Sequence, residues 1–276
     1  SGKNGSGPVE LYPYAVTEEF LHWAQPLLES GAVLIGDKKR YLDTGWWGHK
    51  GGLHRWIGDL DKEAFPEQIG MPVARGFVAR NAEEILKACE LLGTHKVILK
   101  PYILSGGFDM KVCLDRDDVC SYKIPEMPEA IAHKNGELMP VAVEELLDID
   151  NDENGEKAYS LQFTGTRIME GLTRQIVHGK THWAGNQIPS GATEDFEKEA
   201  EKIVTNFLEH MKPQGPGGVD IASVNGKPVV LEINGGRPTG AHNPKGFRKA
   251  FDPRAVETIF EKEDKYDLLG KSVEEA

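Results

Sequence analysis

Residues 217–234, GGVDIASVNGKPVVLEIN, decide the fold. Two runs rich in Val and Ile flank an Asn-Gly pair, which favours a tight turn between antiparallel strands. Three oxygen-bearing side chains interrupt these apolar runs: Asp220, Glu232 and Asn234. Glu232 and Asn234 are two residues apart, so on a strand they share one face. Carboxylates in apolar strands are costly to bury unless a cation neutralises them, and oxygen ligands suit Mg²⁺ held together with substrate phosphates.

The register of this hairpin determines whether its acids can act together. A two-residue turn at Asn225-Gly226 pairs Asp220 with Leu231 and leaves Asp220 on the face opposite Glu232. A three-residue loop or a β-bulge brings the two carboxylates to one face. A metal site on this hairpin therefore predicts an odd-length loop or a bulge. The alternative is an ordinary surface hairpin with solvated acids, because short motifs have many false matches.

A second feature is a short apolar strand at 95–101, HKVILKP, that carries Lys100 near its end. Ser105, Gly106 and Gly107 follow in a loop whose backbone amides can approach phosphate oxygens, since glycine has no Cβ. Lys100 would supply a point charge to those phosphates. Neither a Walker loop nor a dinucleotide fingerprint is present, and Ser-Gly-Gly by itself is more often a structural turn.

Between these two features lies a third, the segment 140–148, PVAVEELLD. A strand that ends in an acidic pair and a leucine pair can offer backbone hydrogen bonds to a flat purine between apolar side chains. The alternative for this segment alone is an amphipathic strand with solvated acids.

In this order, the features resemble the ATP-grasp superfamily, in which two α+β subdomains clamp ATP between them. The resemblance runs from about Lys50 to about Pro244 and includes IGMPV at 69–73 and a helix expected over 81–92. Each motif is loose, but together and in this order they are specific. The resemblance implies an α+β fold with a short N-terminal segment at 1–49, a first subdomain at 50–140, a second at 141–245 and a C-terminal tail at 246–276.

The resemblance also implies roles for individual residues. Lys100 would contact the ATP phosphates during catalysis, under a lid formed by Ser105, Gly106 and Gly107. One acid within 148–156 would contact the ribose, and the sequence leaves open which one. Asp220, Glu232 and Asn234 would bind one or two Mg²⁺ (or Mn²⁺) ions that bridge the β- and γ-phosphates. The remaining nucleotide contacts would come from Lys50, Glu144, Glu145, Leu147, Asp148 and Arg167.

The sequence departs from the family pattern at Arg237. Carboxylate ligases of the family usually have Glu-x-Asn-x-Arg, whereas residues 232–237 are EINGGR, which places the arginine one residue late. Two glycines could let the loop bring Arg237 to an acyl phosphate, the interpretation that we favour. The alternative is an arginine turned outward, which would weaken a ligase assignment. The loop at 239–242, TGAH, adds a nearer resemblance to pheganomycin-type peptide ligases.

The implied function is that of an ATP-dependent carboxylate–amine ligase. ATP would phosphorylate a small-molecule carboxylate, and an amine would attack the acyl phosphate to form an amide, with an amino acid or peptide as the expected substrate class. Two alternatives stay open: an ATP-grasp kinase that phosphorylates a small molecule, and a nucleotide-binding module without catalysis. Retention of Lys100 and the three metal-ligand candidates disfavours the module, because a merely folded hairpin would gain from losing buried charges.

Composition limits the partners. The net charge of −12 argues against nucleic acid. No apolar run approaches the ~18 residues that cross a bilayer, so no membrane partner is expected. Three cysteines without metal spacing favour a reduced, cytoplasmic compartment. Full-length members of the family that the sequence resembles normally have a Rossmann-like domain of about one hundred residues before the clamp. Fewer than fifty residues precede Lys50, so the resemblance implies that this domain is shortened, divergent or absent, and that a homodimer or another chain could complete the substrate pocket.

Several local patterns predict individual elements. Helices are expected at 17–25, with Pro26 ending or kinking the first, and at 193–211; strands are expected at 32–35 and 161–168. Arg174 could steady the transferred group or form an exposed salt bridge. The run 46–55, WWGHKGGLHR, could line the acceptor pocket, fold over the nucleotide, or only anchor an irregular connection.

Overall fold

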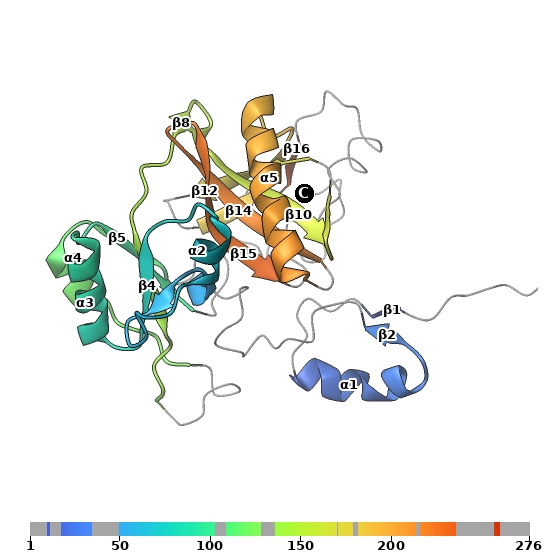
Figure 1. The fold of residues 1–276 in the computed structure, drawn as a ribbon, viewed down its shortest axis with the longest axis horizontal. Coiled ribbons are helices and arrows are strands. Elements are labelled where there is room, and N and C mark those ends of the chain that lie inside the picture. Colours follow the sequence, from blue (N-terminus) through green and yellow to red (C-terminus); the bar gives the residue numbers. More distant parts are fainter. Residues whose placement is uncertain are drawn as a thin grey trace, which may run out of the picture.

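The computed structural model describes residues 10–11, 18–34, 50–102, 109–127, 136–169, 171–178, 182–213, 216–235 and 257–259. They form two α+β lobes and a small N-terminal unit (Figure 1). The first lobe comprises the described residues of 50–145, and the second those of 151–259. No helix in these ranges combines the length and apolar character needed to cross a membrane.

The first lobe is built on a five-stranded sheet in the order β3-β4-β7-β5-β6. Strands β3 and β4 are parallel, and the other pairs are antiparallel. The elements of this lobe are η1 (Lys50–Leu53), β3 (Arg55–Trp56), α2 (Phe65–Ile69), β4 (Gly76–Ala79), α3 (Ala82–Leu92), β5 (Val97–Pro101), β6 (Lys111–Cys113), α4 (Arg116–Cys120) and β7 (Val141–Glu145).

The ends of helix α3 are determined by its local sequence. The Asn81 side chain caps its start by accepting a hydrogen bond from the Glu84 N–H, and Gly93 ends it in a left-handed conformation. Its buried side chains recur with helical spacing and pack on the sheet. The helix expected over 81–92 is therefore present. The buried positions are Ile85, Ala88, Cys89 and Leu92.

Strand β7 lies at the centre of the first sheet, between β4 and β5. The boundary predicted between residues 140 and 141 therefore cuts through this sheet, and residues 141–145 pair with the first lobe. The strand's partners lie forty or more residues earlier in the chain. Local periodicity carries no information about such pairings.

The second lobe contains a seven-stranded sheet with the path β15-β14-β10-β12-β13-β16, and β11 also pairs with β10. Strand β16 lies within 246–276, so part of the expected tail adds a strand to this sheet by pairing with β13. The elements of this lobe are β8 (Asn151–Asp152), β9 (Gly155–Glu156), β10 (Ala158–Thr164), β11 (Arg167–Ile168), β12 (Thr173–His178), β13 (His182–Ile188), α5 (Glu194–Met211), β14 (Pro216–Val224), β15 (Lys227–Gly235) and β16 (Glu257–Ile259).

The two faces of the second sheet differ in character. Apolar side chains on one face pack against α5, whose start is capped by Thr193, as the helix expected over 193–211 requires. The other face carries Ser160, Gln162 and Asp220. The single strand expected over 161–168 is instead a β10–β11 hairpin, because Gly165 turns the chain with a φ of 55°.

The segment after α2 joins the two lobes. Val230 of β15 donates a backbone hydrogen bond to the Pro72 carbonyl at 2.8 Å, and Val73 forms a parallel bridge with Val230. The Phe65 ring lies 6.1 Å from the Phe207 ring of α5. The outer edge of β15 therefore faces the first lobe.

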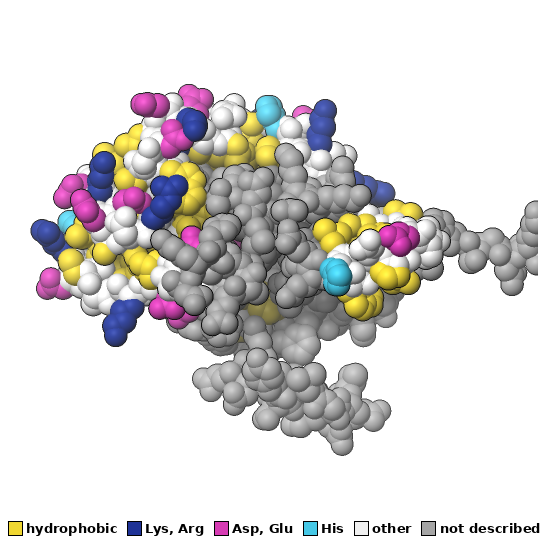
Figure 2. All heavy atoms as spheres, turned by 90° about the horizontal axis from the view of Figure 1, so that it is seen from below, with side chains coloured by type: hydrophobic (Ala, Val, Ile, Leu, Met, Phe, Trp, Pro, Cys, Tyr) yellow, Lys and Arg dark blue, Asp and Glu magenta, His cyan; other side chains and the backbone are white. Residues whose placement is uncertain are grey.

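The N-terminal unit consists of β1 (Glu10–Leu11), α1 (Glu18–Glu29) and β2 (Val33–Leu34), with β1 and β2 parallel. Helix α1 continues past Pro26, where we expected an end or a kink; the proline removes one backbone hydrogen bond at an exposed position. Trp23 is 64% exposed, and hydrophobic side chains gather on this part of the surface in Figure 2.

Arg174 is buried and engaged in a structural ion pair. It donates to both carboxylate oxygens of Asp152, at 2.8 and 2.7 Å, and to the Gly155 carbonyl at 2.9 Å. It therefore anchors the β8–β9 hairpin to β12. Of the two roles weighed from the sequence, the salt bridge is present, but its arginine is buried where we expected an exposed pair. These hydrogen bonds from Arg174 lower the pKa of Asp152 to about 2.

We expect Asp152→Asn to lower the free energy of unfolding at pH 6 by about 2 kcal/mol, since it weakens a charge-assisted pair to a buried arginine. The folded-state pKa lies below the ordinary value of 3.8. The stabilisation is therefore complete above that value and is lost as pH falls towards 2. Urea unfolding between pH 6 and pH 3 should show the difference from wild type shrinking. The exposed neighbour Glu153 gives the control Glu153→Gln; an equal effect there would contradict this assignment.

Candidate functional site

The β14–β15 hairpin combines a two-residue turn with a bulge. Asn225 and Gly226 have φ values of 52° and 74°, the left-handed pair that such a turn needs. Pairing runs regularly from Val224 opposite Lys227 and then shifts, so that Asp220 lies opposite Glu232. Leu231 is the extra residue of the bulge. The bulge that a site on this hairpin requires is present, and it places both carboxylates on one face.

Asp220 is held by polar neighbours on adjacent strands. Ser160 Oγ donates to Asp220 Oδ1 at 2.8 Å, and Asn234 Nδ2 donates to Asp220 Oδ2 at 2.9 Å. A hydrogen bond from the Gln175 side chain also reaches the carboxylate. Burial first, and then the negative charge of Glu232, raise the pKa of Asp220 to about 6. A cation bound between the two acids would oppose both causes of this shift.

Lys50 reaches the hairpin from the first lobe. Its ammonium group forms an ion pair with Glu232, and the lysine is buried. Its backbone N–H donates to the Tyr102 carbonyl at 3.2 Å. A Cβ on Gly51 would lie 2.3 Å from the Tyr102 ring, so only glycine lets η1 approach so closely.

Lys100 reaches the same hairpin from β5. Its Nζ lies 2.5 Å from Glu144 Oε2 and donates to the Leu231 carbonyl at 3.3 Å. Leu231 is the bulged residue, so the bulge that aligns the acids also turns a carbonyl towards this lysine. Both predicted phosphate-contacting lysines thus meet β15 within one cluster, which we call the lysine–carboxylate cluster: Lys50, Lys100, Glu144, Asp220, Glu232 and Asn234.

Glu144 takes part through its side chain, which is buried. Burial alone would raise the pKa of this carboxyl, but the charge of Lys100 and the contact with His54 outweigh it and lower the pKa to about 2. Glu144 therefore carries a full charge at neutral pH. The sequence pattern predicts only backbone contacts from Glu144, and neither the role of its side chain nor that of His54 can be predicted from it.

The backbone of the segment 140–148, from which we expected hydrogen bonds to a purine, already forms several hydrogen bonds within the protein. Glu145 N–H donates to the Arg75 carbonyl at 2.9 Å, and Leu146 N–H donates to the Lys96 carbonyl at 3.0 Å. The Glu145 side chain forms an exposed ion pair with Arg75 at 2.7 Å. Backbone N–H donors for a purine would therefore come from Leu147 onward, and not from Glu145 or Leu146.

The acids expected near the ribose divide into two groups. Asp150 accepts hydrogen bonds from Ser223 Oγ at 2.6 Å and from the Gly226 N–H at 2.7 Å, and so clamps the hairpin tip. Asp152 binds Arg174, as described above. Asp148 is exposed, and no described contact ties it to the hairpin tip or to Arg174. The structure therefore leaves Asp148, Glu153 and Glu156 as the acids that remain for a ribose.

The other predicted residues lie apart from this cluster or outside the described ranges. Arg167 is exposed on β11, opposite Thr164, roughly 13 Å along the sheet from the level of Ser160 by strand rise. The predicted lid (Ser105, Gly106 and Gly107) and Arg237 lie outside the described residues, as does the first part of the run 46–55. Their roles stay predictions.

The oxygen donors of Asp220, Glu232 and Asn234 fit a hard cation such as Mg²⁺, which also binds phosphate oxygens. Among the described residues, no group of three or more His, Cys, Asp and Glu side chains could hold a metal ion. Asp220 and Glu232 supply two carboxylates and Asn234 an amide, all oxygen donors. Mg²⁺ typically takes one or two carboxylates and completes its shell with substrate phosphates and water.

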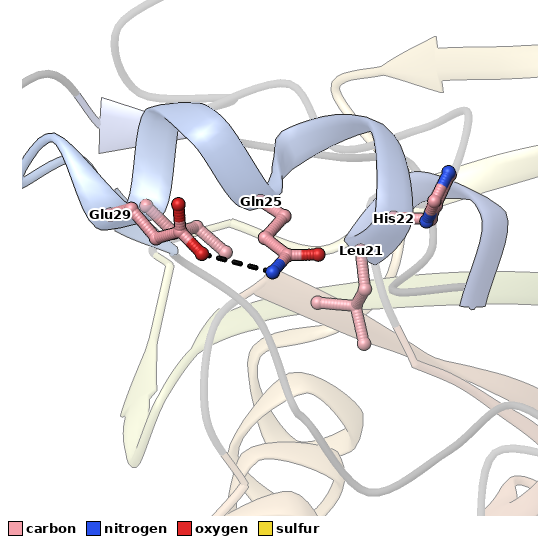
Figure 3. Close-up of a pocket in the computed structure, with 5 residues that line it drawn as sticks. Leu21, His22, Gln25 and Glu29 are labelled. Atoms are coloured by element: carbon pink, nitrogen blue, oxygen red, sulfur yellow. Dashed lines mark hydrogen bonds between the residues drawn. The ribbon is translucent and has the colours of Figure 1, made fainter.

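An open surface pocket of about 450 Å³ lies along α1 and is lined by Leu21, His22, Gln25, Leu28 and Glu29 (Figure 3). Gln25 donates to Glu29 across it at 2.9 Å. None of the predicted site residues lines this pocket.

Comparison with known proteins bears on this architecture. No family model matches the chain. The carbamoyl phosphate synthase large chain of Pseudothermotoga lettingae is 27% identical over 179 residues, which are 62% of this chain and 15% of that protein. Biotin carboxylase from Campylobacter jejuni, solved with an ATP analogue, matches 88% of this chain with a TM-score of 0.62 at 15% identity. The chain has the ATP-grasp fold.

Two further structures show this ATP-grasp fold in other settings. The biotin carboxylase domain of Hydrogenobacter thermophilus 2-oxoglutarate carboxylase, solved with MgADP, ADP and bicarbonate, covers 83% of this chain with a TM-score of 0.57 at 15% identity. Phosphoribosylamine–glycine ligase from Thermotoga maritima covers 88% with a TM-score of 0.54 at 18% identity. The chain spans about half the length of the two carboxylase structures, 48% and 52%, and 68% of the ligase. The α+β prediction is confirmed, and the pheganomycin-type resemblance stays a prediction.

Proposed function

We propose that the chain binds MgATP between its two lobes and uses it to activate a small-molecule carboxylate as an acyl phosphate, which an amine then attacks to form an amide. The observation that carries this proposal is the lysine–carboxylate cluster. Two buried lysines of the first lobe reach the hairpin on which a bulge aligns Asp220 and Glu232. Lys50 forms an ion pair with Glu232, and Lys100, which is paired with Glu144 of its own lobe, donates to the carbonyl of the bulged residue. Such a cluster stabilises the fold less than apolar packing would, which favours a functional reason for it.

The proposed role of each residue follows from its present partner. Asp220, Glu232 and Asn234 would hold Mg²⁺, which when bound neutralises phosphate charge. Lys50 now neutralises Glu232, so a metal on Glu232 would release the Lys50 ammonium to a phosphate oxygen. Lys100 would contact the phosphates from beside the Leu231 carbonyl. Phosphoryl transfer depends mainly on positioning and charge neutralisation, and these groups supply both.

The ligase form of the proposal also has support. Phosphoribosylamine–glycine ligase is named for joining an amine to an amino acid, and it shares the fold over most of this chain. Arg237 would steady the acyl phosphate, and Ser105, Gly106 and Gly107 would cover the triphosphate and exclude water from an intermediate that hydrolyses readily. Leu147, with the neighbouring Glu144, Glu145 and Asp148, would bind the adenosine, and Arg167 is kept as a more distant phosphate contact. Amino acids or peptides are the proposed substrates, in a cytoplasmic setting, with dimerisation as one route to a complete pocket.

A substrate screen tests this proposal. We expect ADP release from MgATP only when a suitable carboxylate and amine are both present, with a product whose mass is the sum of the two minus water. Amino acids are assayed singly and in pairs by coupled ADP detection and mass spectrometry. A product heavier by one phosphoryl group, formed without an amine, would show a kinase instead. Failure of the chain to bind MgATP in a parallel titration would refute the proposal.

A further inference from the structure

We propose that His54 is a positioning residue: its imidazole fixes the Glu144 carboxylate, which in turn holds the Lys100 ammonium where it meets the phosphates of MgATP. This inference rests on the proposed function. His54 belongs to no motif that the fold resemblance carries, and it does not contact the hairpin acids in any described interaction. The role of His54 follows from its contact with the buried Glu144 carboxylate.

The Glu144 carboxylate is bracketed by two nitrogen atoms, one on each oxygen. Lys100 Nζ lies 2.5 Å from Oε2, and His54 Nε2 lies 3.1 Å from Oε1. The side chains of His54 and Glu144 are each 3% exposed. The imidazole is at ion-pair distance but not aligned as a hydrogen bond, and among the described residues neither atom has a hydrogen-bonding partner. With both oxygens contacted, the carboxylate cannot rotate without separating one of the two nitrogens.

A glycine on the neighbouring strand makes room for this imidazole. Gly76 of β4 lies directly opposite Glu144 of β7. A Cβ at Gly76 would lie 2.9 Å from His54 Cε1 and 2.9 Å from the Val143 carbonyl oxygen. The ring therefore occupies space that any other residue on β4 would fill. The His54 backbone N–H donates to the Gly51 carbonyl at 3.0 Å, which ties the ring to the same short segment that delivers Lys50.

Glu144 needs His54 as a second partner because Lys100 would also have to contact the phosphates of MgATP. A buried carboxylate with only one cation would lose its compensation whenever that cation turned towards a phosphate, and an unpaired buried charge is strongly destabilising. His54 keeps Glu144 partnered while Lys100 is shared between the carboxylate, the Leu231 carbonyl and an incoming phosphate. Apo contacts of this kind are often long and tighten when the ligand binds. A histidine that only filled core space would need no carboxylate opposite it.

The first test compares MgATP with adenosine, which lacks phosphates. We expect His54→Ala to weaken MgATP binding about tenfold, comparable to losing one contact to a charged group, and to change adenosine binding by less than about twofold. His54→Gln can still donate an N–H to Glu144 and should stay within about threefold of wild type. Affinities are measured on the full chain by calorimetry for MgATP and by competition for adenosine. Val119→Ala, in the core of the same lobe away from the cluster, controls for lost stability.

The second test is a double-mutant cycle with Lys100→Met, which separates positioning from packing. If His54 acts through Lys100, His54→Ala has no further effect on MgATP affinity in that background. Equal weakening of MgATP and adenosine by His54→Ala, or the same tenfold loss without Lys100, would overturn the inference. If His54→Ala does not fold, His54→Asn, too short to reach Glu144, takes its place with the same expectations. Wild-type chain that binds no MgATP refutes the proposed function itself, whereas normal MgATP binding by a folded His54→Ala refutes this inference alone.

Discussion

Lys100→Met is expected to reduce ATP turnover by about a thousandfold and to lower the free energy of unfolding at pH 7 by about 3–5 kcal/mol. Turnover falls because the proposed phosphate contact is lost. Stability falls because Glu144 keeps a buried charge with His54 as its remaining partner. Turnover is measured as ADP release with the substrates found by the screen, and stability by urea unfolding.

The pH dependence of this loss has a definite sign. In the wild-type chain the pKa of Glu144 is about 2, against an ordinary value of 4.5, so the pair stabilises the fold fully above pH 4.5 and less as pH falls. Without Lys100, burial acts with less opposition and raises that pKa. The stability difference between variant and wild type should therefore shrink from pH 7 to pH 4. A difference that grew with acidity would contradict the ion pair.

The double variant Lys100→Met/Glu144→Gln separates the two effects. Removing both charges leaves no unpaired buried ion, so most of the lost stability should return. Turnover should stay low, since the phosphate contact is still missing. Recovery of turnover together with stability would show that Lys100 acts only in folding.

Glu232→Gln is expected to reduce turnover by about a hundred- to a thousandfold, because an amide is a weaker metal ligand than a carboxylate and carries no charge. The amide oxygen can still accept a hydrogen bond from Lys50, so unfolding free energy should change by less than about 1.5 kcal/mol. The apparent Mg²⁺ requirement should rise, as measured by a metal titration of ADP release.

The matched control for Glu232→Gln is Lys227→Gln on the same strand. Lys227 is exposed and lies at the turn end of β15, away from the cluster. It should leave both turnover and metal requirement unchanged. Full activity of Glu232→Gln at low Mg²⁺ would remove Glu232 from the metal site.

Local sequence predicts the hairpin because its chemistry is local. Asn225-Gly226 supplies the left-handed turn, and the alternation around it defines the strands. The requirement that Asp220 and Glu232 share a face predicts an odd-length loop or a bulge. The sequence alone does not distinguish the two, and the structure has a bulge at Leu231.

Residues that complete the site depend on pairings between distant strands and could not be predicted. Ser160 reaches Asp220 because β10 lies beside β14, sixty residues later in the chain. His54 meets Glu144 because Gly76, opposite Glu144, leaves space for the ring. The same non-local pairing places β7 in the first sheet, against the boundary expected before Val141. Single-sequence patterns report which face a residue takes on its own element, and not which strand will lie next to it.

The most direct test of the central claim is the position of a bound metal. Crystals grown with Mn²⁺ and a non-hydrolysable ATP analogue allow the metal to be placed by its anomalous scattering. We predict a peak contacting Asp220 and Glu232 on the bulged face, with the terminal phosphate within hydrogen-bonding distance of Lys100. A nucleotide bound with its metal away from both carboxylates, or with Lys100 still paired only to Glu144 and remote from every phosphate, would contradict the account.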